Sequence, residues 1–285
     1  MISQGGVVFG ARFDENWEVK HDFTENSDGL SAFRGSKYLQ SRIEDAYSKV
    51  EIFLRQGRVV LFSGTPCQVA GLKRYLRQEY ENLLTTDFVC HGVPSPLVWR
   101  EYLKETSKNQ KVVNVNFRDK NESWKKYKLV VDGKEVIVNQ PFYTNEYMLG
   151  FLRDIYLRPS CYACPAKSGK SGADITLGDF WGIENYLPEF DDDKGVSLVM
   201  VQTEKGATYF NALRCDRIEA NYERALAGNP SIEKNAYCSP KYRRMFWQSK
   251  DKINNISRII SKMKPSLLRR CIGYAKRVIR KLILR

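Results

Sequence analysis

Four cysteines stand where thiolates could bind a metal or take part in redox chemistry. Cys161 and Cys164 form a Cys-x-x-Cys pair that is followed directly by Pro165. This spacing lets two thiolates reach one iron–sulfur cluster or one zinc ion. Cys67 lies in a Gly-Thr-Pro turn and Cys90 ends an apolar run. Together they make four thiolates, the number that a 4Fe-4S cluster needs.

The elements around Cys67 and Cys90 predict that both lie at one edge of a sheet. Residues 58–62 and 82–90 are apolar runs typical of strands, and a helical pattern follows each of them. This alternation predicts two parallel strands, and ligands bind at the carboxyl ends of such strands. Cys67 would also lie near a helix N-terminus, where backbone N–H groups and the helix dipole stabilise a thiolate.

These thiols have alternative uses. Four thiolates could close a structural zinc site with no open position. Cys67 with His91 could serve a thiol enzyme. Buried cysteines are also common and inert. Cys215, Cys238 and Cys271 have no comparable context, and we expect them to be structural.

The pattern of the whole chain predicts an α/β fold. We expect a mixed sheet with parallel strand–helix units flanked by helices, an antiparallel hairpin and a basic C-terminal helix. Residues 6–23 read as two strands, and residues 35–57 as one helix because apolar residues recur at helical spacing. The hairpin turn is expected at Asp132-Gly133. Residues 195–213 predict a strand, a turn and a helix.

Composition restricts the class of protein. The hydrophobic content of 42% fits a folded globular chain, and 285 residues are ample for a core. No stretch reaches 18 uncharged apolar residues, and the N-terminus has no basic start followed by an apolar run. We therefore expect a cytoplasmic protein. Its seven cysteines, an odd number, argue against a disulfide scaffold and for metal binding or redox work.

The positive charge is concentrated at the C-terminal end. Residues 241–285 hold 15 of the 46 basic residues and one acidic residue. We therefore divide the chain into a nearly neutral domain over 1–240 and a basic tail over 241–285. A neutral domain argues against nucleic-acid binding. Residues 265–285 alternate apolar and basic positions at helical spacing, which predicts either attachment to an anionic membrane surface or packing against the body or an acidic redox partner.

Several long segments, in order, resemble the coenzyme F-420 hydrogenase/dehydrogenase beta-subunit family. They read GSKYLQS, VLFSGTPCQVAGLKRYL, DFVCHGVPSP, FRDK with a following Trp, CYACPAKSGKSGADITLGDFWG and GVSLVMVQTEKG. The similarity spans about residues 5–215. It looks closest to a bacterial branch often met among polysaccharide-biosynthesis genes.

The resemblance implies an oxidoreductase that carries FAD and iron–sulfur clusters and passes electrons between a cluster and an organic acceptor. Relatives reduce the deazaflavin coenzyme F-420 or chlorophyll-type pigments. Carried onto this chain, Cys67, Cys90, Cys161 and Cys164 are the expected ligands of the 4Fe-4S cluster. The expected flavin side comprises Ser36, Lys37, Tyr38, Gly64, Thr65, Pro66, Gln68, Gly178, Asp179 and Trp181.

Each flavin-side segment also has a simpler interpretation. Ser36 and Lys37 could be a helix cap and a solvated cation. Asp179 and its aromatic neighbours could form a buried loop in which the carboxylate caps a turn. The His91 side chain could be an ordinary hydrogen-bonded histidine.

The sequence departs from the family pattern at its start. Members of this branch usually begin with a ferredoxin-like domain and a Ser-Ser-Gly-Gly segment, and neither precedes GGVVFG here. We therefore expect electrons from a separate ferredoxin-like donor or subunit. The alternative is a shortened, cofactor-poor member that acts by binding a partner or as a zinc-stabilised structural protein.

Overall fold

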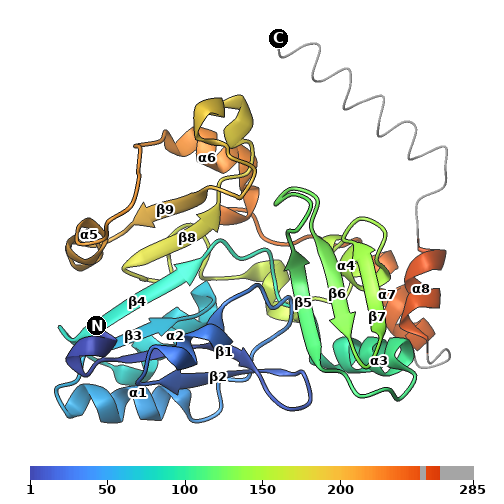
Figure 1. Ribbon diagram of the computed structural model, residues 1–285, viewed down its shortest axis with the longest axis horizontal. Coiled ribbons are helices and arrows are strands. Elements are labelled where there is room, and N and C mark those ends of the chain that lie inside the picture. The colour runs from blue at the N-terminus through green and yellow to red at the C-terminus, as the bar shows by residue number, and fades with distance from the viewer. Residues whose placement is uncertain (251–254, 264–285) are drawn as a thin grey trace.

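The chain folds around two β-sheets. The computed structural model describes residues 1–250 and 255–263, apart from the side chain of Lys250. One sheet has six strands in the order β2-β1-β3-β4-β8-β9, and the other has the order β5-β6-β7 (Figure 1). The strands are β1 (Val7–Phe13), β2 (Val19–Thr24), β3 (Val60–Ser63), β4 (Leu83–Phe88), β5 (Asn114–Asp119), β6 (Lys128–Asp132), β7 (Val136–Pro141), β8 (Ile175–Asp179) and β9 (Ser197–Val201). The helices are α1 (Ala46–Arg55), α2 (Pro66–Leu76), α3 (Pro96–Ser107), α4 (Glu146–Leu152), α5 (Glu204–Asn211), α6 (Tyr222–Gly228), α7 (Pro240–Lys250) and α8 (Ile256–Lys262).

The predicted α/β class and its mixed sheet are confirmed. Strands β1, β3, β4 and β8 run parallel, while β2 and β9 pair antiparallel at the two edges. The hairpin turn expected at Asp132-Gly133 connects β6 to β7. The strand, turn and helix expected over 195–213 are β9 and α5.

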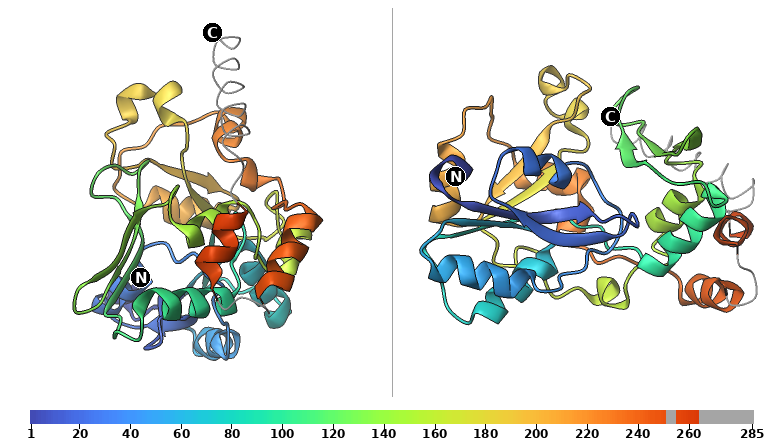
Figure 2. Two further views of the ribbon diagram at one scale, coloured as in Figure 1. Left: turned by 90° about the vertical axis from the view of Figure 1, so that its right-hand side faces the viewer. Right: turned by 60° about the horizontal axis from the view of Figure 1, so that its bottom comes forward.

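Helices α1 and α2 cover one face of the six-stranded sheet (Figure 2). Their apolar faces supply Val50, Leu54, Val69 and Leu72, which pack with Phe62 and its neighbours. The alternation of side chains along a strand places the next residues on the opposite face. There Phe88, Leu177 and Val201, from three adjacent strands, are 42%, 41% and 39% exposed.

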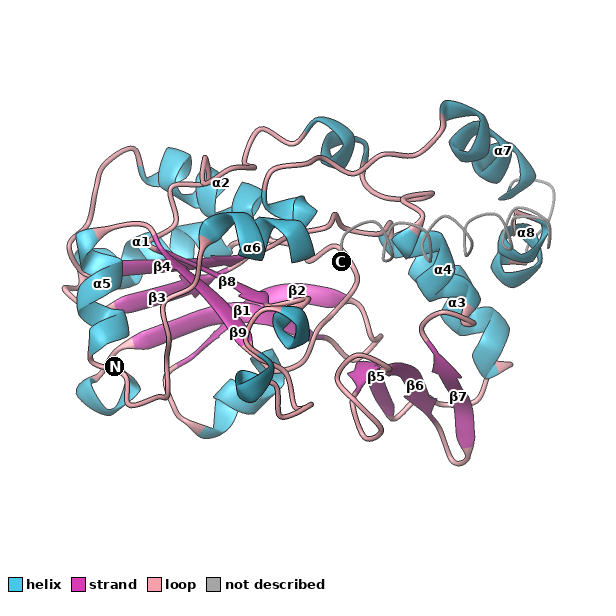
Figure 3. Cartoon of the chain, turned by 90° about the horizontal axis from the view of Figure 1, so that it is seen from above, coloured by secondary structure: helices cyan, strands magenta, loops and turns pink. Residues whose placement is uncertain are grey.

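The three-stranded sheet packs against α3 and α4, α8 packs on these two helices, and α7 packs on α8 (Figure 3). Its core includes Trp99, Phe117 and Tyr147, all fully buried. Phe246 from α7 and Ile260 from α8 belong to the same cluster. Residues on both sides of the predicted division at 240 and 241 therefore share one core. The tail helix predicted over 265–285 lies outside the described residues, and in the described part no helix has the length and apolar character needed to cross a membrane.

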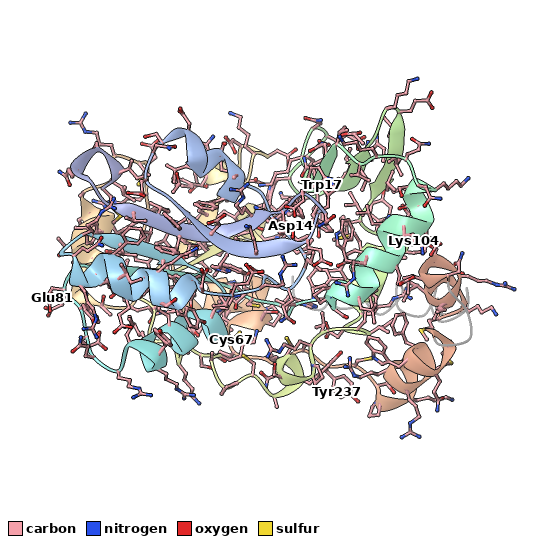
Figure 4. The ribbon with its side chains drawn as sticks, turned by 90° about the horizontal axis from the view of Figure 1, so that it is seen from below. Asp14, Trp17, Cys67, Glu81, Lys104 and Tyr237 are labelled. Carbon is pink, nitrogen blue, oxygen red and sulfur yellow. The ribbon has the colours of Figure 1, made fainter. Side chains whose placement is uncertain are left out.

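The turn between β1 and β2 reaches from the larger sheet to α3. Trp17 lies in this turn, and its indole N–H donates to the Val112 carbonyl while its own carbonyl accepts from Trp99. Figure 4 shows Asp14 and Trp17 at this end of the hairpin, beside α3. These bonds tie the hairpin to the second sheet.

The helix predicted over residues 35–57 is wrong in its first half. Helix α1 begins only at Ala46. The preceding backbone instead bonds to β2, because the Arg42 N–H donates to Val19 and the Arg42 carbonyl accepts from His21. Gly35 and Glu44 both have positive φ, which interrupts a right-handed helix.

The buried Asp174 side chain connects β4 to the segment that precedes α5, and its substitution tests what these hydrogen bonds contribute to stability. This buried carboxylate accepts from the Thr85 N–H at 2.8 Å, from the Thr85 hydroxyl at 2.7 Å and from the Thr203 hydroxyl at 2.7 Å. We expect Asp174→Ala to lower the free energy of unfolding by about 2–4 kcal/mol, because it leaves a buried N–H unpaired. The exposed Asp192→Ala is the matched control, and we expect it to leave the urea denaturation midpoint nearly unchanged. Equal losses in the two variants would contradict this account.

Candidate functional site

The turn that carries Cys67 is built by the start of α2. Thr65 is the N-cap, its side chain caps the first turn, and the Gln68 side chain accepts from the Thr65 N–H at 2.9 Å. Pro66 is the first helical residue, where its missing N–H costs nothing. The Thr65 hydroxyl lies 3.2 Å from the Cys67 sulfur. Cys67 is exposed at this end of the helix, which is the end that faces the segment carrying Cys161 (Figure 4).

All four predicted cysteine ligands come to one region. The Cys90 thiol is close enough to Cys67 and Cys161 for their charges to raise its pKa, and Cys161 is affected in the same way by Cys67 and Cys164. Burial is the larger cause of both shifts and raises the pKa of Cys90 to about 12. The four side chains are free thiols. Within the described part of the chain, no three His, Cys, Asp or Glu side chains are arranged to hold a metal ion.

The backbone near Cys90 is fixed by charged neighbours. The buried Lys167 ammonium donates to the Cys90 carbonyl, and its charge opposes the rise in the pKa of the thiol. The Val93 N–H points at the Cys161 sulfur, 3.5 Å away. His91 Nε2 lies 2.6 Å from Asp154 Oδ1. His91 therefore lies against Asp154 beside the thiols, and its ring contacts Phe151 edge-on.

A second cluster forms around Arg118, where two of the predicted flavin-side segments meet. The Arg118 side chain is 8% exposed and pairs with Asp179. Its guanidinium lies over the ring of Tyr127 at 4.7 Å and over that of Trp181 at 5.6 Å. The partly buried Tyr38 lies beside it, close enough to interact with both charges.

Burial and the neighbouring charges shift the pKa values of the side chains in this cluster. Desolvation raises the pKa of Tyr38, and the Arg118 charge partly opposes that rise. For Arg118, desolvation lowers the pKa, but Tyr38 and Asp179 outweigh it and the net pKa is raised. The guanidinium is therefore a permanent positive charge between the two sheets.

Lys37 is a second cation near this cluster. Its ammonium donates to the carbonyls of Arg34 at 2.9 Å and Gly35 at 3.2 Å, and also to Phe33. Burial lowers the pKa of Lys37 to about 8. The Ser36 hydroxyl lies close enough to the Tyr38 side chain to oppose the rise in its pKa. Ser36 is therefore not a helix cap here, and Lys37 is a half-buried cation held by carbonyl oxygens.

The third predicted flavin-side segment, Gly64–Gln68, is connected to the segment Ser36–Tyr38 by residues 38–42. The Gln68 amide donates to the Ser41 carbonyl at 3.3 Å. His21 bridges the same two segments, with Nδ1 2.7 Å from the Ser41 hydroxyl and Nε2 3.0 Å from the Ser63 carbonyl. One continuous strip of chain thus runs from the Arg118 cluster to the turn of Cys67.

Two of the predicted glycines have a packing role. A Cβ on Gly178 would lie 2.8 Å from a Val89 methyl carbon, and one on Gly64 would lie 3.1 Å from the Phe62 ring. Both positions therefore require glycine for close packing. The ring of Trp181 stacks on Trp124 at 4.6 Å.

Arg118, Trp124 and His21 were not assigned a role from the sequence. Arg118 and Trp124 lie in the segment FRDK with its following Trp, which contributed to the family resemblance without suggesting a function. Their contact with Asp179 and Trp181 spans about sixty residues of chain, so it depends on how the two sheets pack. For His21, alternation along its strand indicated only a face of the sheet.

The fold and the thiols define an α/β protein with a cysteine-rich site at the carboxyl edge of its parallel strands. A family model that describes the C terminus of the coenzyme F420 hydrogenase/dehydrogenase beta subunit matches residues 57–224. The match covers more than half of the 285 residues, so the chain belongs to this family.

Two further comparisons complete these findings. A structure of the xenon-derivatised F420-reducing [NiFe] hydrogenase complex from Methanosarcina barkeri is similar, with a TM-score of 0.48 and 16% identity over 74% of this chain and 67% of that chain. Among curated proteins, none matches this sequence.

His21 makes the stability of this region dependent on pH. Burial lowers the pKa of His21 to about 4 from its usual 6.5, so the unfolded chain binds a proton that the folded chain does not. The free energy of unfolding is therefore highest above pH 6.5 and falls by about 3 kcal/mol as the pH drops towards 4.

The variant His21→Gln removes this contribution, and we expect a flatter profile between pH 6.5 and 4 in urea denaturation. The chain has two histidines, so His91→Gln is the matched control and should keep the wild-type slope. If both variants retain the slope, His21 is not its source.

Proposed function

We propose that this chain is an iron–sulfur flavoprotein oxidoreductase. In this proposal Cys67, Cys90, Cys161 and Cys164 hold a 4Fe-4S cluster, and FAD binds beside it. The observation that carries the proposal is that four thiols from three separate segments gather in one region. Their number and kind fit a cluster, since 4Fe-4S clusters are held by four Cys thiolates.

The flavin side is supported by the kind of groups that face the Arg118 cluster. Asp179 and Trp181 are partly exposed, and Lys37 supplies a second cation. Aromatic faces, a carboxylate and cations are the groups that suit a ring system carrying a diphosphate. The predicted set Ser36, Lys37, Tyr38, Gly64, Thr65, Pro66, Gln68, Gly178, Asp179 and Trp181 stays the proposed flavin side.

Bound flavin and cluster would supply the electron and hydride transfer, and the protein would orient them. The Thr65–Gln68 capping box fixes the start of α2 and so the direction of Cys67. Lys167 holds the Cys90 backbone and contributes a positive charge beside the thiols. A positive charge stabilises bound thiolates.

The acceptor and the partners follow from the family. We propose an organic acceptor of the coenzyme F-420 type or another reducible molecule, and a ferredoxin-like donor or subunit. A role in polysaccharide biosynthesis and attachment of residues 265–285 to an anionic membrane surface stay proposals from the sequence.

The test is the iron, acid-labile sulfide and flavin content of protein purified without oxygen. We expect about four irons per wild-type chain. Cys67→Ser, Cys90→Ser, Cys161→Ser and Cys164→Ser should each lose most of that iron. The exposed Cys215→Ser is the matched control and should keep it.

Other outcomes have defined meanings. One zinc per chain in place of iron would favour the structural alternative. A folded chain with neither metal nor flavin would favour a partner-binding protein. Iron that survives all four substitutions would contradict the assignment of the ligands.

A further inference from the structure

A pocket lies on the sheet face that α2 covers, beside the thiols but separate from the Arg118 cluster. Its volume is about 140 Å³. Strands β4, β8 and β9 form its floor, with Asp87, Thr176 and Met200, and α2 contributes Pro66. Residues 167–169 form one wall, at the start of a turn over 167–172 that reads Lys-Ser-Gly-Lys-Ser-Gly, and Gln202 lies at the exposed rim. The function proposed above gives this turn no ligand.

Lys167 places a positive charge on this wall. The residue is 9% exposed, and its ammonium donates to the Cys90 carbonyl and, at 2.6 Å, to the Ser231 carbonyl. In the described part of the chain no carboxylate pairs with it. An ammonium has three N–H donors, so one remains for a ligand. A buried cation that no carboxylate neutralises favours a nearby anion.

The position of Lys167 is set by the backbone. The Ser168 N–H donates to the Ile232 carbonyl at 2.9 Å, and the Lys170 N–H closes the turn onto the Lys167 carbonyl at 3.2 Å. Ser168 has a φ of +57°, a conformation that serine adopts only when its surroundings impose it. The ammonium is therefore positioned before any ligand arrives. The N-terminus of α2, at Pro66, adds a second source of positive potential.

The floor of the pocket presents an acceptor. The buried Asp87 accepts a hydrogen bond from the Thr176 hydroxyl, and no basic side chain in the described part of the chain pairs with it. Burial raises the pKa of Asp87. A carboxyl oxygen here suits a ligand hydroxyl that donates to it.

We propose that this pocket binds a small oxyanion that also carries a hydroxyl group, such as hydrogen phosphate or a hydroxycarboxylate. The oxyanion would contact the Lys167 ammonium and the hydroxyl would face Asp87. The size fits, because a protein cavity of about 150 Å³ holds a six-carbon ring. Cys90 and Pro66, which the proposed function assigns to the cluster and the flavin, also line this pocket. The proposal itself is argued from Lys167 and Asp87 and requires no bound cofactor.

Isothermal titration of the full chain, purified without oxygen, tests the proposal. The probes are sodium phosphate, glycolate and, as a ligand without a hydroxyl, acetate. We expect phosphate or glycolate to bind at least about tenfold more tightly than acetate, since a lost hydrogen bond to a charged group is worth about a factor of ten. Binding of phosphate alone identifies a phosphate-bearing ligand, and binding of glycolate alone a hydroxy acid. If neither binds, the proposal is wrong.

Two lysines of the same turn give a matched pair of variants. Lys170 is exposed and does not line the pocket. We expect Lys167→Gln to weaken binding at least about tenfold through loss of the charged hydrogen bond, and Lys170→Gln to leave it within about twofold. Equal affinities in the two variants would overturn the proposal.

If Lys167→Gln does not fold, a substitution of Gln202 at the edge of the pocket tests anion binding instead. Gln202 is exposed, so Gln202→Glu should not disturb the core, which thermal melting checks. The new negative charge at the mouth should weaken anion binding at low salt. Unchanged affinity in Gln202→Glu would contradict the assigned pocket.

Discussion

The ion pair between Arg118 and Asp179 is the interaction on which the candidate site depends. Arg118 lies on β5 of the smaller sheet, and Asp179 ends β8 of the larger one. A guanidinium that is 8% exposed needs a counter-charge, because a buried unpaired charge costs several kcal/mol. The pair therefore links the two sheets, and the rings of Tyr127 and Trp181 lie against the guanidinium.

Residues 38–42 form the second connection between the sheets. The Tyr38 carbonyl accepts from Tyr147 in the core of the smaller sheet, while Ser41 contacts His21 and Gln68 in the larger one. Arg42 anchors the end of the strip by pairing with Asp14 at 2.8 Å and with Glu18. The strip therefore holds the Arg118 cluster and the turn that carries Cys67 in fixed positions relative to each other. This physical continuity is why groups far apart in the sequence form one site.

The sequence predicted the parallel strands and the hairpin, because each follows from local rules. The site of four cysteine ligands stays a prediction, since in the described part of the chain no three such side chains are arranged to hold a metal ion. Apolar runs with helices between them specify parallel strands, and the carboxyl ends of such strands share an edge. Its helix over 35–57 is wrong in the first half, since the backbone of Arg42 bonds to β2 instead of continuing a helix. It also left Arg118 without a role. Its partner Asp179 is distant in the chain, and one sequence carries no local signal for such a pair.

The pocket of Lys167 is a second feature that the sequence alone does not predict. The repeated Lys-Ser-Gly letters look alike in the sequence, yet one lysine is buried and the other is exposed. The difference arises because the first ammonium finds the carbonyls of Cys90 and Ser231 across the fold. Tertiary contacts, not composition, decide which of two identical residues lines a pocket.

The most direct test of the central claim is a coulometric reductive titration of the wild-type chain, purified without oxygen. A cluster and a flavin in one site should together accept about three electrons per chain, one in the cluster and two in the flavin. The account predicts this number, with bleaching of both the cluster and the flavin absorption. A folded chain that accepts no electrons would contradict it.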